Sequence, residues 1–317
     1  MLNPEDFEDF VAETDSRRPR RIKANHKPKL SPWAVAASLE ERDALGHNAL
    51  RFSSAFDGIK TEKAWIAENL TQFYHGRLIT EVSRRVKGGK EANVYCCLGY
   101  PTSGYDLLAA KLYRPRKFRS LKDTTQYQQG RAVLDAAGEA VGQRDWRMHK
   151  AIAQKSRVGL AAAQTSWLMY EFSLMQKLHA AGADVPEPIK HSEYVLMMEY
   201  IGDKSMPAPT LIDVDLDAAE ARILFDRLLW NIELMLAQGW IHGDLSAYNV
   251  LYWEGAITLI DFPQVVDLQA NPDARFILRR DVERVCQYFA RYGVRADGRR
   301  LANDLWQKCA PRKETLP

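Results

Sequence analysis

Cysteine is scarce in this 317-residue sequence: only Cys96, Cys97, Cys286 and Cys309 are present, and no two of them form a CxxC pair. No histidine stands at zinc-ligand spacing from them, so neither a zinc knuckle nor a disulfide framework is indicated. Apolar runs of the roughly 18 to 20 residues needed to cross a bilayer are also missing. The first nine residues are acidic and lack the apolar core of a secretory signal. We therefore expect a cytoplasmic protein with reduced thiols and no membrane contact.

The amino-acid composition is that of a globular protein. Hydrophobic residues make up 46% of the chain and charged residues 27%, which excludes the disordered and collagen-like classes. The net charge is only +3, but the basic residues are unevenly distributed. Residues 17–29 read RRPRRIKANHKPK, a basic run without an acid in which two prolines prevent a continuous helix. Residues 1–62 are therefore predicted to form a basic, flexible N-terminal extension.

Hydrophobic periodicity predicts a β-rich lobe after this extension. Apolar residues recur at near-helical spacing over 63–73, and strand-like segments follow. These predicted strands cover residues 79–86, 92–98, 107–113 and 193–201. Residues 114–165 are basic, rich in Gln and Ala and without a sustained apolar face, so they are expected to be a mobile insertion with helical pieces before a helix over 166–180. The whole lobe is expected to span residues 63–201.

The remaining residues, 202–317, predict a second and more helical lobe. Apolar positions over 218–238 form one wide face, which indicates a long helix buried on that side. Short strands are expected at 241–245, 250–252 and 257–261, around a loop. Strands followed by helices predict an α+β fold with two lobes.

The polar residues of the second lobe that could carry chemistry are close together in the sequence. The string HGDLSAYN begins at His242, and after a short predicted hairpin the string LID ends at Asp261. Phosphoryl transfer requires such a set, with Asp244 to orient the attacking oxygen and Asn249 and Asp261 to hold a divalent cation. Oxygen ligands favour Mg2+, or alternatively Mn2+, over zinc. Each residue alone could cap a turn or strand, but the combination predicts a catalytic site.

Four strings in the sequence resemble those of one kinase family. They are GKEANVY at 89–95, MPAP at 206–209, IHGDLSAYN at 241–249 and LIDFPQ at 259–264. In this order they resemble the RIO family of atypical serine/threonine protein kinases, and its bacterial members most. The resemblance implies a protein kinase-like fold with a β-rich N-lobe and a small, truncated helical C-lobe. It also implies an enzyme that uses ATP and Mg2+ to phosphorylate Ser or Thr, including residues of its own chain.

The resemblance assigns a role to Lys111. This residue stands in the middle of the apolar strand 107–113, where a buried ammonium group needs an opposite charge. By similarity to kinases it would bridge the α- and β-phosphates of ATP and pair with Glu171. Glu68 or Glu91 could also be its partner.

The remaining nucleotide contacts are also implied by the resemblance. Gly88, Gly89 and Lys90 lie between two predicted strands, where a glycine turn can present backbone N–H groups to phosphate oxygens. The segment that ends the strand before residue 202 resembles the kinase hinge. Backbone groups of Glu199 and Ile201 would bind adenine there.

Three alternatives to a protein kinase remain open. Some RIO proteins act mainly as ATPases coupled to a macromolecular partner, and hydrolysis through a phospho-aspartate on Asp261 is compatible with the sequence. A small-molecule phosphotransferase of the aminoglycoside or choline kinase type shares HGDLxxxN, but GKEANVY and the short C-terminal lobe speak against it. A nucleotide-switched module could also contact a ribosome or RNA through the basic residues of 17–29 and 114–122, although a solvated surface is the ordinary explanation of such charge runs.

Overall fold

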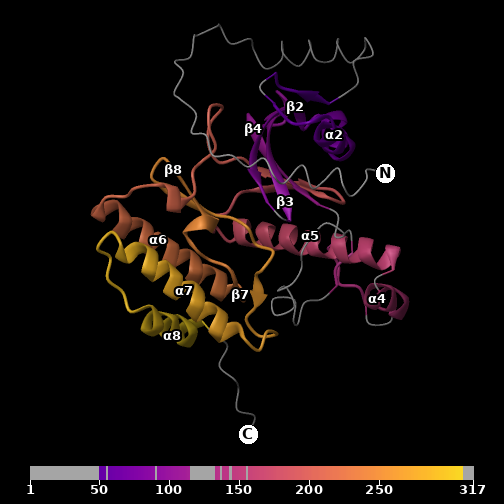
Figure 1. Ribbon diagram of the computed structural model, residues 1–317. Helices are drawn as coiled ribbons and strands as arrows, with labels where there is room; N and C mark the ends of the chain where they lie inside the picture. The colour runs from indigo at the N-terminus through magenta and orange to yellow at the C-terminus, as the bar shows by residue number, and fades with distance from the viewer. Residues whose placement is uncertain are drawn as a thin grey trace. The chain divides into compact units, whose positions relative to one another are not determined.

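The computed structural model describes residues 50–54, 56–89, 91–114, 133–135, 138–142, 145–154 and 156–309 (Figure 1). These residues form two compact units. The first unit contains the described residues up to 114 together with 189–200, and the second contains the others. The basic segment 17–29 and most of the predicted extension 1–62 lie outside the described residues.

The first unit is built on a six-stranded sheet. In spatial order its strands are β1 (Arg51–Phe52), β2 (Ile79–Gly88), β3 (Ala92–Gly99), β4 (Leu107–Tyr113), β6 (Val195–Glu199) and β5 (Pro188–His191). β1 and β2 pair in parallel, whereas the pairs β2–β3, β3–β4 and β4–β6 are antiparallel. Apolar residues dominate β3 and β4, and their Val and Tyr residues favour the extended conformation.

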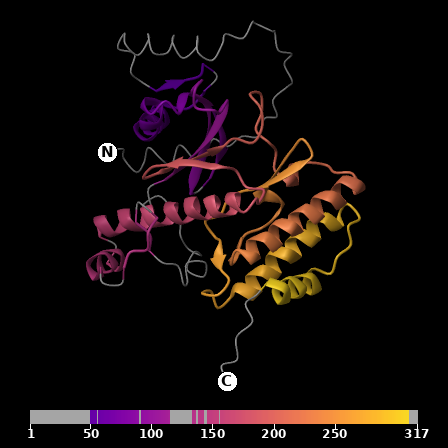
Figure 2. The ribbon, with the colours of Figure 1, turned by 180° about the vertical axis from the view of Figure 1, so that it is seen from behind.

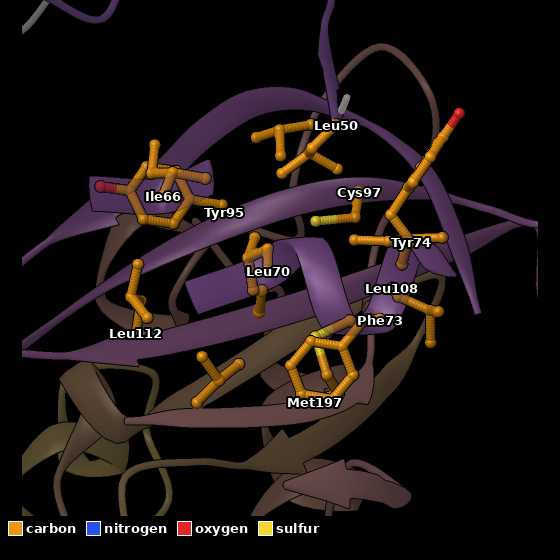
Figure 3. Packing of buried hydrophobic residues seen from close by; sticks show 14 of the residues in the cluster. Leu50, Ile66, Leu70, Phe73, Tyr74, Tyr95, Cys97, Leu108, Leu112 and Met197 are labelled. Carbon is orange, nitrogen blue, oxygen red and sulfur yellow. The ribbon is translucent and has the colours of Figure 1, made fainter. Parts of the chain in front are cut away.

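Helix α2 (Lys60–His75) packs on this sheet. The side chains buried together in this contact are those of Ile66, Leu70 and Phe73 from the helix and Tyr95, Cys97, Leu108, Leu112 and Met197 from the sheet (Figure 3). Burying one large apolar side chain contributes about 1.5 to 3 kcal/mol. Leu70 is fully buried, so truncating it to Ala would cost about 2 to 5 kcal/mol. Leu50 and Phe56 belong to the same cluster, so the folded unit includes residues before the boundary expected at residue 63.

The second unit is mainly helical. Its helices are α4 (Trp146–Ala153), α5 (Arg157–Ala180), α6 (Ala218–Ala237), α7 (Ala274–Ala290) and α8 (Gly298–Cys309). Two small sheets pair β7 (Trp240–Ile241) with β10 (Val266–Asp267) and β8 (Val250–Trp253) with β9 (Ala256–Leu259). Helices α6, α7 and α8 pack side by side (Figure 2). Within the described part of the chain, no helix has the length and apolar character needed to cross a membrane.

Helical pieces expected within the stretch 114–165 are present in the structure. Helix α4 and the first turns of α5 lie within it, and each has an N-cap that satisfies a free backbone N–H group. The Asp145 side chain accepts a hydrogen bond from the Met148 N–H, and the Ser156 hydroxyl accepts one from the Gly159 N–H. Capping supports these helices in a stretch without a sustained apolar face, and the mobility of the insertion stays a prediction. Residues 115–132 lie outside the described residues.

Helix α5 belongs to the second unit and not to the predicted lobe 63–201. Its Tyr170 ring meets the Trp240 ring edge to face, and the Lys177 ammonium lies 6.0 Å from the centre of the same Trp240 ring. These contacts tie α5 to the strand that precedes the HGDLSAYN string. Sequence periodicity alone cannot assign a helix to one unit or the other, because it does not identify the surface on which the helix packs.

The predicted α+β class is confirmed, and most predicted elements are present. The predicted helices 63–73 and 218–238 correspond to α2 and α6, and the strands around residue 111 correspond to β2, β3, β4 and β6. The strand predicted at 241–245 is wrong beyond Ile241. The chain turns there because Gly243 has a φ angle of 84°, which is incompatible with an extended strand.

Candidate active site

The HGDLSAYN string forms the loop between β7 and β8 in the second unit. A Cβ atom at Gly243 would lie 2.1 Å from the carbonyl oxygen of Gln264, so only glycine fits there without moving the backbone. The loop ends in a short 3-10 helix, η4 (Ala247–Asn249), that leads into β8. This path leaves the side chain of Asp244 partly exposed.

Asp244 and Asn249 are in direct contact. The Asn249 Nδ2 donates to the main-chain oxygen of Asp244 at 2.9 Å and lies 3.3 Å from its Oδ2. Because the amide nitrogen is used in this way, the amide oxygen is the side-chain atom of Asn249 left for a cation. The Asn249 carbonyl accepts a hydrogen bond of 3.0 Å from the N–H of Ile260, the residue before Asp261. The structure thus brings the Asp244 loop and the segment carrying Asp261 together in one hydrogen-bonded corner.

His242 joins the same two segments. Its side chain is buried, with Nε2 3.2 Å from the carbonyl oxygen of Ile260 and Nδ1 3.4 Å from the backbone nitrogen of Asp244. Since the Asp244 N–H donates to Nδ1, the proton of the imidazole belongs on Nε2, which donates to Ile260. The ring also packs 5.2 Å from that of Phe262. His242 is therefore a structural link within the site.

Asp261 has an unusual backbone conformation. Its φ angle is 72°, in the left-handed region that non-glycine residues enter at a cost of roughly 1 to 2 kcal/mol. Such strain concentrates at functional positions, where the surrounding structure maintains it. The residue is also exposed, so its carboxylate is accessible to a ligand.

Three residues that the sequence analysis missed hold this loop from α7. Asp281 is only 2% exposed; its Oδ2 accepts the Gly243 N–H at 2.8 Å, and its carboxylate also accepts from the backbone of Leu245. Arg280 donates to the Gly243 carbonyl and, at 3.1 Å, to Asp281 Oδ1. Burial raises the pKa of the Asp281 carboxyl, and the charge of Arg280 opposes that rise. Arg284 lies one turn further along the helix and is described below.

Lys111 lies on β4 in the first unit, as predicted. It is 8% exposed, and its register partners are Val94 on β3 and Leu196 on β6. Its ammonium group is 5.4 Å from the centre of the Tyr113 ring, a cation–π distance that offsets part of the cost of burial. Glu171 is 1% exposed on α5, in the second unit. The pairing of Lys111 with Glu171 stays a prediction.

The two predicted hinge residues lie on either side of the division between the units. Glu199 ends β6 opposite Leu108 of β4, whereas Ile201 is the first residue of the next segment of the second unit. The Ile201 carbonyl accepts a hydrogen bond of 3.0 Å from the Ala208 N–H. The N–H of Ile201 is therefore the backbone group that we predict for an adenine contact.

The glycine turn is described at Gly88 and Gly89, whereas Lys90 lies outside the described residues. Gly88 closes β2 opposite Asn93. The N–H of Gly89 points back to the side-chain oxygen of Asn93, at 3.4 Å. This amide is used within the first unit, so the phosphate contact expected of it would require the turn to change conformation.

Asn93 belongs to a buried chain of polar groups. Its Oδ1 also accepts from Arg114 Nη2 at 3.1 Å, and its Nδ2 donates to the Tyr95 hydroxyl at 3.0 Å. That hydroxyl donates in turn to Glu62 of α2 at 2.8 Å. Burial raises the pKa of the Glu62 carboxyl, and the hydrogen bond from Tyr95 opposes the rise. Arg114, the first residue of the basic stretch 114–122, is 6% exposed and donates to Asn93 inside the unit.

Comparison with known proteins finds one family. Residues 139–301, just over half of the chain, match the family model described as RIO domain. The chain is 32% identical over 228 residues to serine/threonine-protein kinase RIO1 of Chaetomium thermophilum, a match that covers 68% of this chain and 41% of that protein. It is also 32% identical over 142 residues to RIO-type serine/threonine-protein kinase Rio1 of Thermoplasma acidophilum, covering 45% of this chain and 73% of the archaeal protein. The chain thus spans less than half the length of the fungal relative.

The Rio2 kinase from Chaetomium thermophilum is a similar solved structure, with 21% identity, a TM-score of 0.48, and coverage of 89% of this chain and 83% of that one. Because this TM-score is below 0.5, the fold described above is argued from the helices and strands of this chain alone. The relatives named here are archaeal and eukaryotic, so the expected likeness to bacterial members is not confirmed. The family model covers the strings MPAP, IHGDLSAYN and LIDFPQ, and the chain belongs to the RIO family.

Proposed function

We propose that this chain is an ATP- and Mg2+-dependent serine/threonine protein kinase of the RIO type that can also phosphorylate itself. The observation that carries the proposal is the contact of the Asn249 side chain with Asp244, together with the hydrogen bond from the N–H of Ile260, the residue before Asp261, to the Asn249 carbonyl. These three side chains are of the types that phosphoryl transfer requires. The relatives named above are called serine/threonine-protein kinases, which use ATP with a divalent metal.

Asp244 would bind the hydroxyl group of the substrate that becomes phosphorylated. Its carboxylate would accept the hydroxyl hydrogen bond and orient the oxygen for in-line attack on the γ-phosphate. The side chain is 39% exposed, so an acceptor hydroxyl can reach it.

The donor atoms at Asn249 and Asp261 fit a hard divalent cation. Both residues offer oxygen, and the amide nitrogen of Asn249 is already used by Asp244. When bound there, Mg2+ would neutralise charge on the phosphate oxygens. No group of three or more His, Cys, Asp or Glu side chains suited to a metal occurs among the described residues. Phosphate oxygens and waters would therefore complete the coordination, as is usual for Mg2+.

The nucleotide itself would contact further residues that the sequence predicts. Lys111 would neutralise the α- and β-phosphates, with Glu171 as its partner, and the backbone of Glu199 and Ile201 would bind adenine. The glycine turn before Asn93 would approach the phosphates by giving up its bond to that side chain. The glycine turn is supported by its place at the start of the string GKEANVY, and the other contacts are those that the likeness to kinases implies.

The test is incubation of the pure protein with γ-labelled ATP and Mg2+, measuring label on protein and free phosphate together. Acid-stable label on Ser or Thr is expected. We expect Asp244→Asn and Asp261→Asn each to lower transfer by about 100-fold or more. Asp261→Asn should also weaken Mg2+-dependent nucleotide binding, whereas Asp244→Asn should not. Equal loss of nucleotide affinity in both variants would contradict the roles assigned to them.

ATP hydrolysis through a phospho-aspartate is a second candidate, favoured by the exposed and strained Asp261. Its signature in the same assay is protein-bound label that hydroxylamine removes, together with release of phosphate. A ribosome or RNA contact would now depend on residues 17–29 and 115–122, which lie outside the described residues. The cytoplasm remains the proposed compartment.

A further inference from the structure

Arg284 contacts the carboxylate of Asp244 directly. Its Nη1 lies 2.9 Å from Asp244 Oδ1, although the two residues are 40 positions apart in the sequence. Both side chains are partly exposed, at 41% for the arginine and 39% for the aspartate. Arg284 therefore reaches from α7 to the tip of the loop that carries the proposed catalytic carboxylate.

This ion pair differs from the long, exposed charge pairs made by other residues of the same helix. Arg279 lies 3.9 Å from Glu283, and Arg299 of α8 lies 3.8 Å from the same glutamate. Such long, exposed pairs contribute little, because solvent screens them and their side chains remain free to move. The contact of Arg284 with Asp244 is shorter and joins two separate elements, so it can fix the position of one relative to the other.

The partner oxygen of the same carboxylate is also engaged. Asp244 Oδ2 lies 3.3 Å from Asn249 Nδ2, so the carboxylate has a donor on each oxygen, one from the loop and one from α7. The backbone on either side of Asp244 is held too, because Asp281 accepts the Gly243 N–H and a backbone bond from Leu245. One face of α7 thus controls both the backbone and the side chain of this loop.

We propose that Arg284 is a positioning residue for phosphoryl transfer: it holds the Asp244 carboxylate in the orientation that accepts the acceptor hydroxyl. This inference rests on the proposed function. Catalysis of phosphoryl transfer depends chiefly on positioning and electrostatics, and displacement of a reacting group by about 1 Å can cost about 100-fold in rate. Without Arg284, Asp244 keeps its contact with Asn249 but can rotate away from the acceptor.

The test compares Arg284→Ala and Arg284→Lys with the wild type, using γ-labelled ATP and casein as the acceptor. Arg284→Ala is expected to lower kcat by about 10- to 100-fold while the KM for ATP changes less than about twofold, because nucleotide contacts are untouched. Arg284→Lys should recover part of the rate, since an ammonium group can still donate to Oδ1. Because the site is partly exposed, millimolar guanidinium should also restore part of the rate of Arg284→Ala.

Arg279→Ala is the matched control, since Arg279 lies on the same helix with the same 41% exposure, and its contacts with Glu283 at 3.9 Å and with the Phe276 ring at 5.4 Å stay within α7. It should leave kcat unchanged, with or without guanidinium. In the double variant Asp244→Asn/Arg284→Ala, kcat should equal that of Asp244→Asn alone, because the arginine acts through the aspartate.

Each other outcome overturns the inference. A wild-type kcat in Arg284→Ala, or a double variant far slower than Asp244→Asn, shows that Arg284 does not act through Asp244. A slow Arg284→Ala that unfolds at a lower temperature and is rescued by neither lysine nor guanidinium shows a structural role. If wild type and Asp244→Asn transfer label equally, the proposed function itself fails, and the positioning role fails with it.

Discussion

Replacing Asp281 with Asn should destabilise the protein and slow it at the same time. The aspartate is 2% exposed and accepts hydrogen bonds from the Gly243 N–H, from the backbone of Leu245 and from Arg280. Asparagine keeps one acceptor oxygen and places an NH2 group where the other oxygen meets donors. At least one hydrogen bond is therefore lost, and two donors are brought face to face.

The size of this effect follows from two opposing contributions. A hydrogen bond to a charged group contributes about 1.5 to 3 kcal/mol, and leaving a buried donor unsatisfied adds to the loss. Burial raises the pKa of Asp281, so the substitution also removes a carboxylate whose ionisation burial disfavours. The net cost in the free energy of unfolding should be about 2 to 3 kcal/mol, a loss that a domain stable by about 5 to 15 kcal/mol survives.

Urea unfolding followed by circular dichroism measures this cost, and the label-transfer assay measures kcat on the same samples. We expect a lower unfolding midpoint and a kcat reduced at least about 10-fold, because the Asp244 loop loses its anchor on α7. Asp304→Asn on α8 is the control, since Asp304 is 65% exposed and its ion pair with Arg300 is long, at 3.9 Å. An Asp281→Asn variant with wild-type unfolding and wild-type kcat would refute the claim that α7 holds the loop.

Three further predictions follow from other parts of the chain. Because burial raises the pKa of Glu62 above its ordinary value near 4.5, the folded state binds a proton more tightly than the unfolded state, and stability falls as pH rises through that window. Urea unfolding from pH 4.5 to 7.5 should show Glu62→Gln gaining stability relative to wild type, with no such trend for the exposed Glu68→Gln. Of the four free thiols, Cys309 is partly exposed and the other three are buried. A thiol reagent should therefore label Cys309 first in the native protein, and mass spectrometry should find the other three labelled only after unfolding. Gly243→Ala should unfold readily or lose activity, because its Cβ would lie 2.1 Å from a carbonyl oxygen. Gly255 has a similar φ angle of 82° but open space around it, so Gly255→Ala should lose less stability in the same assays, namely the cost of that φ angle alone.

The sequence was sufficient to predict the elements that carry strong periodicity. The apolar strand around Lys111 and the amphipathic helix after residue 217 are both present, because burial on one face dictates spacing along the chain. The grouping of Asp244, Asn249 and Asp261 was also predictable, since a short hairpin leaves little freedom between them. The loop path at Gly243 was not, because a single positive φ angle has no periodic signal.

The residues that support the site from a distance were harder to predict. Asp281 has a signal in hindsight, since it stands on the apolar face of α7 with Ile277, Leu278 and Val285, where a carboxylate must find buried donors. Arg284 has none, because an arginine on a helix rich in arginine is ordinarily a solvated residue. Its contact with Asp244 depends on the tertiary packing of α7 against a loop 40 residues earlier.

The strand order of the first unit has a consequence for synthesis of the chain. β4 pairs with β6, but about 80 residues separate them in the sequence, and at roughly 5 to 20 residues per second a ribosome needs about 4 to 16 s to make that stretch. During this time β4 is the edge of an unfinished sheet, because the backbone groups that pair with β6 have no partner yet. A charged residue in the middle of a nascent edge strand discourages pairing with other chains. We therefore expect Lys111 to lower the tendency of the growing polypeptide to aggregate before β6 is made.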